Sequence, residues 1–263
     1  MEPPPPRLFT RVPAGPYSTE PAHRAQGDTS PLETTPVPLL ECLHVAKDFR
    51  VAGERHEVLR DVSFRVERGE IALVRGRSGA GKSTLLALIA GLDRPARGSI
   101  LLDGTDYGAL EPRRLTALRR ESIGIIFQSF NLIDSLSAAE NVELALMHRG
   151  LTRAARQRRA RDLLEELGVA RPGLLPMALS EGLKQRVAIA RALAHDPELV
   201  LADEPTAQLD PETAEGVVSL LLDAVTRRHA SLLVMTHGGG AAELLGHAAG
   251  CGLELRNGSL HRA

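Results

Sequence analysis

Cysteines, long apolar runs and net charge are all scarce in this chain. It has only two cysteines among 263 residues, Cys42 and Cys251, so no spaced cysteine metal site exists and a buried thiol is favoured over a disulfide. No stretch approaches about eighteen apolar residues and no apolar signal core begins the chain, so we expect neither a membrane span nor a leader. The formal net charge of −1 gives no electrostatic argument for nucleic acid or an anionic membrane as main partner. We therefore expect a cytoplasmic protein that reaches a membrane only through a partner.

Lysine is scarce as well, and one of the few lysines stands where a phosphate ligand is needed. Only three of the 32 basic residues are lysines: Lys47, Lys82 and Lys184. Lys82 follows an apolar run at 71–74 and a glycine-rich stretch, and an apolar helical pattern begins with it. Residues 76–84 read Gly-Arg-Ser-Gly-Ala-Gly-Lys-Ser-Thr, the G-x-x-x-x-G-K-S pattern in its strand-to-helix context.

This pattern has a specific physical purpose. Small residues let successive backbone N–H groups turn toward phosphate oxygens, and a helix N-terminus adds its positive dipole end. Lys82 would reach the β- and γ-phosphates, while the Ser83 hydroxyl would bind Mg²⁺. The sequence therefore predicts a nucleoside triphosphate site with Mg²⁺, wrapped by Gly76, Arg77, Ser78, Gly79, Ala80, Gly81, Lys82, Ser83 and Thr84.

A second motif ends with two adjacent acids. Residues 199–206 read Leu-Val-Leu-Ala-Asp-Glu-Pro-Thr, and four apolar residues in a row suit a parallel strand buried on both faces. Asp203 and Glu204 then emerge at the carboxyl end of the strand, where such sheets bind ligands. We expect Asp203 to hold the Mg²⁺ hydration shell and Glu204 to position and deprotonate an attacking water.

The remaining pattern predicts a proline-rich tail followed by an α/β domain. Residues 1–38 are rich in proline and poor in large apolar residues, so we expect a disordered tail, with a proline-rich docking ligand as the alternative. An all-helical insertion is expected at about 129–195, because no strand pattern occurs there and 152–167 has an apolar helical stripe. The arginines of that helix suit a solvated face or an acidic partner. Strands are predicted at 39–45, 62–66, 71–74, 99–102, 123–127, 199–202, 232–235 and 252–255.

Five further motifs resemble those of the ATP-binding cassette (ABC) family, and the resemblance covers residues 40–260. Residues 178–186, Ala-Leu-Ser-Glu-Gly-Leu-Lys-Gln-Arg, are similar to the family signature LSGGQ and its continuation. Phe127-Gln128 resembles the Q-loop, and Thr236-His237 resembles the H-loop. Residues 207–210 stand where the family has its D-loop, and Phe49 falls where it has an aromatic residue that stacks on adenine.

The resemblance implies a fold and a set of partners. The fold would be a P-loop NTPase domain of the ABC type over 39–263, with an antiparallel β subdomain and the helical insertion. Two cassettes would pair head-to-tail around two ATP molecules, as a homodimer or heterodimer, on an integral membrane permease at the cytoplasmic face of the membrane. Nucleic acid is not expected as a partner.

The resemblance also implies roles for single residues. Gln128 would touch Mg²⁺ and report the nucleotide state to the helical insertion, and His237 would contact the γ-phosphate beside Glu204. Ser180 and Gly182 would bind the γ-phosphate of the opposite subunit. Asp210 of the D-loop joins these cofactor-binding residues.

Three departures from the family pattern affect the elements that would reach a partner cassette. The signature has Glu181 and Leu183 where the family has glycine and glutamine, residues 207–208 are Ala-Gln, and glycines at 238–240 follow His237. A heterodimer with unequal ATP sites is one interpretation, and a homodimer that tolerates the changes is the other. Glu181 could avoid repelling phosphate by pointing to solvent or by pairing with Lys184.

Three functions remain open for such a cassette. Residues 90–95 and 131–142 resemble the subgroup that serves lipoprotein-release and macrolide-efflux exporters, so the first is powering an export permease. The second is a signalling ATPase of the cell-division type, which acts on a membrane partner without transport. The third is a cassette acting on ribosomes or DNA, but such proteins usually have tandem cassettes or a long coiled-coil insertion.

Overall fold

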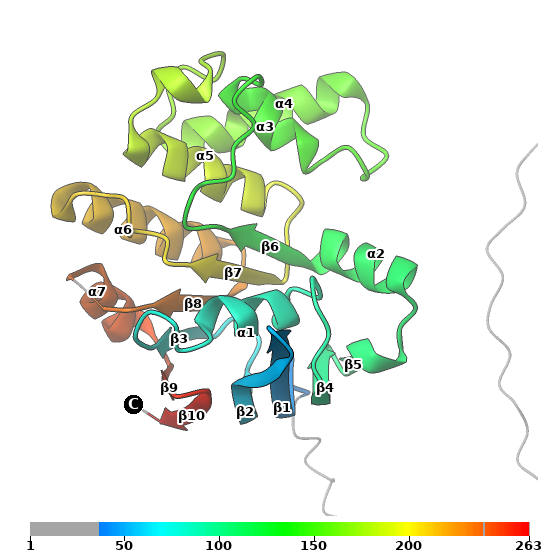
Figure 1. Ribbon diagram of the computed structural model, residues 1–263. Helices are drawn as coiled ribbons and strands as arrows, with labels where there is room; N and C mark the ends of the chain where they lie inside the picture. Colours follow the sequence, from blue (N-terminus) through cyan, green and yellow to red (C-terminus); the bar gives the residue numbers. More distant parts are fainter. Residues whose placement is uncertain (1–36, 239, 263) are drawn as a thin grey trace, which may run out of the picture. The chain divides into compact units, whose positions relative to one another are not determined.

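A computed structural model describes residues 37–238 and 240–262 (Figure 1). The predicted tail lies outside the described residues except for its last two positions. The strands are β1 Leu40–Val51, β2 Glu54–Val66, β3 Ile71–Arg75, β4 Arg97–Leu102, β5 Thr105–Asp106, β6 Ile123–Ile126, β7 Leu199–Asp203, β8 Ser231–Thr236, β9 Cys251–Arg256 and β10 Ser259–Arg262. The helices are α1 Lys82–Ile89, α2 Pro112–Ser122, α3 Ala138–Leu144, α4 Arg153–Glu166, α5 Glu181–Leu193, α6 Pro211–Arg227 and α7 Gly240–Ala248, with short 3₁₀ turns at Tyr107–Ala109 and Pro176–Ala178.

The central sheet is buried on both faces. Its strand order is β10-β9-β3-β8-β7-β6, and only the β9–β10 pair is antiparallel. Neighbouring residues of β7 enter different cores: Leu201 packs with α1 and the β subdomain, and Val200 packs with α3 to α6. This explains the continuous apolar runs in the sequence, because both faces of each strand must be covered.

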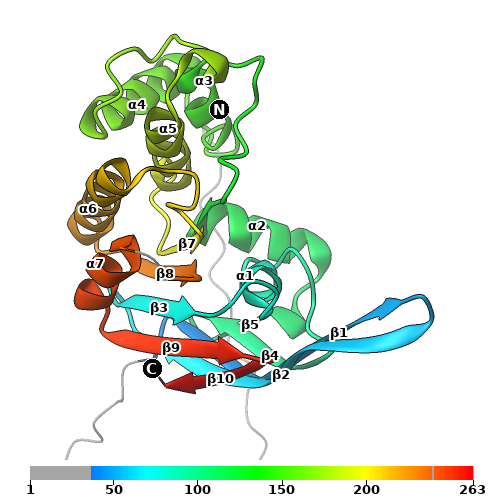
Figure 2. The ribbon, with the colours of Figure 1, turned by 60° about the vertical axis from the view of Figure 1, so that its left-hand side comes forward.

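The second sheet is antiparallel, in the order β2-β1-β4-β5, and α1 lies between it and the central sheet. β1 and β2 extend past the predicted strands into a long hairpin (Figure 2). Its two-residue turn, Ala52-Gly53, has φ values of 51° and 88°, as a primed hairpin turn requires. The sequence pattern did not predict this extension, because both faces of the extended strands are largely polar and exposed.

The eight strands predicted from the sequence are confirmed, and two short strands were missed. β5 and β10 each close a hairpin through a two-residue turn, Asp103-Gly104 and Asn257-Gly258, whose φ values are positive. The Asp-Gly and Asn-Gly pairs were the signals that could have revealed them. Of the two free thiols, Cys42 is buried as expected, but Cys251 is only partly so.

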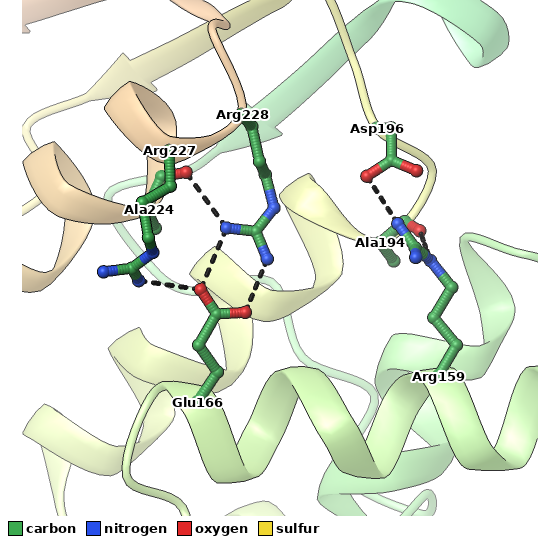
Figure 3. A network of polar contacts seen from close by, with 7 residues as sticks. All are labelled: Arg159, Glu166, Ala194, Asp196, Ala224, Arg227 and Arg228. Atoms are coloured by element: carbon green, nitrogen blue, oxygen red, sulfur yellow. Dashed lines mark hydrogen bonds and ion pairs between the residues drawn. The ribbon is translucent and has the colours of Figure 1, made fainter.

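Helices α3, α4 and α5 gather beyond β6, at the top of Figure 1. Ser137 caps α3 in a reciprocal capping box with Glu140, and Thr152 caps α4. Ion pairs connect α4 to α6: Glu166 pairs with Arg227 and Arg228 near the end of α6 (Figure 3). In the part of the chain that the structure describes, no helix combines the length and apolar character needed to cross a membrane.

Candidate active site

The carboxyl ends of β3, β7 and β8 meet at one edge of the central sheet, and each strand is followed by a predicted site residue. A cavity of about 410 Å³ opens there. Its lining consists of Val58, Ser78, Gly79, Gly81, Lys82, Ser83, Thr84, Gln128, Glu204 and His237. A larger hollow of about 790 Å³, between β1, β2, β9 and β10, contains none of these residues.

The loop from β3 to α1 needs its glycines for two reasons. Gly79 and Gly81 have φ values of 78° and 102°, in the left-handed region that glycine alone adopts at little cost. A Cβ on Gly81 would also lie 2.9 Å from the Leu59 side chain, and one on Gly76 would lie 2.7 Å from the carbonyl of Leu255. The turn therefore brings bare backbone N–H groups to the start of α1, which is the geometry of an anion cradle.

Lys82 is held inside this loop. Its side chain is only 7% exposed, and Nζ donates to the carbonyls of Gly76 at 2.7 Å and Arg77 at 3.2 Å. The same ammonium lies 3.2 Å from Oε1 of Glu204. A buried lysine needs such partners, because an unpaired charge away from water is costly.

Glu204 is the centre of the polar contacts in the cavity. Its other oxygen, Oε2, accepts the backbone N–H of His237 at 3.2 Å and lies 2.7 Å from Nδ1 of that ring. Its backbone is left-handed, with φ of 46°, and its N–H donates to the Met235 carbonyl. The carboxylate is thus aimed into the cavity between the phosphate loop and the end of β8, where it could accept a proton from a bound water.

The neighbouring acid, Asp203, fits a divalent cation. Its Oδ1 is buried without a hydrogen-bond partner among the described residues, and burial raises its pKa while the Ser83 hydroxyl opposes the rise. Oxygen donors of this kind are those that Mg²⁺ prefers, and it commonly keeps water and phosphate as its other ligands. Ser83, Asp203 and the Gln128 amide are therefore suited to hold Mg²⁺ beside a triphosphate.

The other predicted residues lie outside the cavity lining, including the Mg²⁺ candidate Asp203 and the predicted phosphate-binding residues Gly76, Arg77, Ala80 and Gly182. Phe49 is on β1 and is 41% exposed. Ser180 caps α5, and its Oγ accepts the N–H of Leu183. Asp210 caps α6, where its Oδ1 accepts the N–H of Thr213 at 3.0 Å. Val58, on the cavity wall, was not predicted, because a β-branched residue in a strand indicates only packing.

The chain is similar to proteins of one known family. Residues 59–207 match the family described as ABC transporter. The chain is 44% identical over 200 residues to an uncharacterized ABC transporter ATP-binding protein of Thermotoga maritima, covering 76% of this chain and 85% of that protein. It is 47% identical over 180 residues to the methionine import ATP-binding protein MetN 2 of Burkholderia mallei, covering 68% of this chain but only 45% of that protein.

Solved structures show the same fold. The dimeric cassette MJ0796, in a post-hydrolysis state with ADP and Pi, has a TM-score of 0.78 at 35% identity, over 85% of this chain and 97% of that one. The cbiO1 protein of Clostridium perfringens, part of the ABC transporter complex cbiONQ, has a TM-score of 0.74 at 26% identity, over 85% and 87% of the two chains.

Fold and site together define a P-loop ATPase. Within that class the chain belongs to the ABC transporter family, as an ATP-binding cassette that hydrolyses ATP. Members of this family work as dimers with membrane permeases.

Proposed function

We propose that this chain powers a membrane exporter of the lipoprotein-release or macrolide-efflux type, from the cytoplasmic face of the membrane, through ATP-driven pairing of two cassettes. The observation that carries the catalytic part is the Glu204 carboxylate, held between Lys82 and His237 at the wall of the phosphate cavity. The export direction is supported by the subgroup motifs at 90–95 and 131–142, although relatives of this chain include proteins named for methionine import.

In this proposal the residues that line the cavity, together with Asp203 beside it, have separate roles in hydrolysis. The loop N–H groups and Lys82 bind the phosphates, and Ser83, Gln128 and Asp203 hold Mg²⁺, which supplies charge neutralisation when bound. Glu204 takes a proton from the attacking water, and His237 orients that carboxylate.

Residues at the starts of α5 and α6 would contact the nucleotide of the second cassette. Ser180, Gly182 and Asp210 are separate from the phosphate cavity of their own chain, as expected for residues that act on a partner's nucleotide. Glu181 is exposed in the first turn of α5, and no ion pair among the described residues joins it to Lys184. Because no lysine of the described residues neutralises this charge, it supports a second candidate, a heterodimer in which this signature faces the less active ATP site, whereas its exposure to solvent fits a homodimer that tolerates the change.

Glu204→Gln tests the proposal directly. Turnover should fall at least about 100-fold, because general-base catalysis contributes on that order, while MgATP binding is retained. The readouts are phosphate release and calorimetric titration of MgATP. Glu198→Gln is the matched control, since Glu198 directly precedes β7 and pairs with Arg68 away from the cavity. Unchanged turnover in Glu204→Gln would remove it as the base.

A further inference from the structure

Lys47 and Phe49 lie two positions apart on β1, in the long β1–β2 hairpin of Figure 2. The Lys47 ammonium stands over the Phe49 ring, 5.1 Å from the ring centroid. The same nitrogen lies 2.7 Å from Oδ2 of Asp93 and donates to the carbonyl of Arg94 at 2.8 Å. One lysine head group is thus tied to the segment after α1 and also faces an aromatic ring.

Of these two residues the lysine is the more buried and the phenylalanine the more exposed, which is the reverse of the usual pattern. The Lys47 side chain is only 13% exposed, whereas Phe49 is 41% exposed. Lysine normally keeps its ammonium in water, and a large aromatic ring is normally covered. Hydrogen bonding to Lys47 lowers the pKa of Asp93, so the ion pair is maintained at neutral pH. The charge is held inward and the ring is left open to a planar ligand.

Lys47 is also connected to the phosphate loop along two routes. Asp93 follows α1 by a few residues, and α1 begins with Lys82 at the phosphate loop. Lys47 pairs with Leu59 on β2, whose side chain presses against Gly81 of the loop. The Lys47 side chain, and with it the Phe49 ring, is therefore linked to the loop through two short series of contacts.

We propose that Lys47 is a positioning residue that holds the Phe49 ring as the platform for the nucleobase, in register with the phosphate loop. This inference rests on the proposed function, because it takes ATP as the ligand and Phe49 as the residue that receives the base, the role that the family resemblance implies. The ammonium occupies one face of the ring and leaves the other face to a purine, which stacks offset on it. Without this contact the ring could change rotamer, and binding of the base would have to order it.

The test compares MgATP with Mg-tripolyphosphate, which has the phosphates but no base, by calorimetric titration. Lys47→Met keeps the aliphatic stem and removes the charge; it should weaken MgATP binding about fivefold and leave tripolyphosphate binding unchanged. In turnover, KM should rise with kcat unchanged, and Lys47→Arg should restore most of the affinity. Arg55→Ala is the control, because it removes an ion pair with Asp48 on the same hairpin and should behave as wild type.

A double-mutant cycle separates positioning from simple structural support. Phe49→Ala should weaken ATP binding by itself, and adding Lys47→Met to it should change nothing further. Equal weakening of both ligands by Lys47→Met would overturn the inference, since Lys47 would then act on the phosphate loop through Asp93. Unchanged ATP affinity would overturn it too. Wild-type protein that binds neither ligand would contradict the proposed function instead.

Discussion

Gly182 stands in the first turn of α5, and a Cβ atom at this position would lie 2.6 Å from Cγ2 of Thr213 in the first turn of α6. Thr213 is β-branched, so its methyl group has few alternative positions. Its N–H is also bonded to Asp210, which holds this end of α6 in place. The second glycine of the signature therefore has a packing reason within a single chain, besides the phosphate contact that the family resemblance implies.

Replacing Gly182 should destabilise the protein through this contact alone. Gly182→Ala is expected to lower the free energy of unfolding by about 1–3 kcal/mol, the usual cost of overpacking. Thr213→Ser removes the methyl group and keeps the hydroxyl, so the double variant should recover most of the loss. Urea denaturation measures both.

A second glycine offers the control. Gly216 lies on the exposed side of α6, and a Cβ atom there would meet nothing within 4 Å, so Gly216→Ala should stabilise the helix by up to about 1 kcal/mol. If Gly182→Ala were as stable as wild type, the close contact would have no energetic consequence.

At the scale of elements, α4 is joined to the end of α6 by one carboxylate (Figure 3). Glu166 Oε1 lies 2.7 Å from Arg227 and 3.0 Å from Arg228, and Oε2 lies 2.5 Å from the second nitrogen of Arg228. Arg228 also donates to the carbonyl of Ala224. The hydrogen bonds from Arg228, with a smaller effect of Arg227, lower the pKa of Glu166 to about 2.

This ion pair predicts a pH-dependent part of the stability. Because the folded pKa is lowered, the stabilisation is complete above the unfolded value near 4.5 and is lost as the pH falls toward about 2. Glu166 is partly exposed, so screening reduces its contribution to about 1 kcal/mol. Glu166→Gln should therefore be less stable than wild type at pH 7, and the difference should shrink as the pH is lowered through this range.

The neighbouring Glu165 is the control, since it is exposed on the same helix and forms none of the ion pairs of the described residues. Chemical denaturation at several pH values should show no such dependence for Glu165→Gln. A Glu166→Gln difference that stayed constant down to about pH 2 would contradict the assignment to this ion pair.

For the whole molecule, the unusual charge at Glu181 bears on how two cassettes pair. In a single chain the carboxylate is favourable, because it lies at the positive end of the α5 dipole. Across a symmetric ATP-bound dimer it would face a triphosphate, and like charges repel. The same side chain would then help the fold of one chain and oppose closure of two.

Repulsion between the Glu181 carboxylate and the triphosphate predicts that the chain alone dimerises poorly with ATP. Glu181→Gln removes the charge with little change in shape and should raise ATP-dependent dimerisation and turnover by about tenfold, corresponding to roughly 1.4 kcal/mol. Light scattering with MgATP and phosphate release are the measurements, with exposed Glu215→Gln on α6 as control. A wild-type chain that already dimerises and hydrolyses ATP rapidly, unchanged by Glu181→Gln, would favour the homodimer.

Local sequence was enough to predict the phosphate loop and the two acids. A left-handed turn before a helix requires glycine within a few residues, and a strand buried on both faces requires a continuous apolar run. The positions of Lys82 and Glu204 after their strands therefore followed from short patterns, and that of His237 from its resemblance to the family's H-loop. Their convergence could be expected, because the carboxyl ends of neighbouring parallel strands share one edge.

Contacts between distant side chains had no such signal. The Lys47–Asp93 pair, the tie between Glu166 and Arg228, and the close approach of Gly182 to Thr213 each join segments far apart in the chain. Each depends on how long a hairpin extends or where one helix ends against another, and those distances are set by packing of the whole core. The sequence by itself predicted which residues would bind and hydrolyse a nucleotide; only the tertiary structure decided which side chains hold those residues in position.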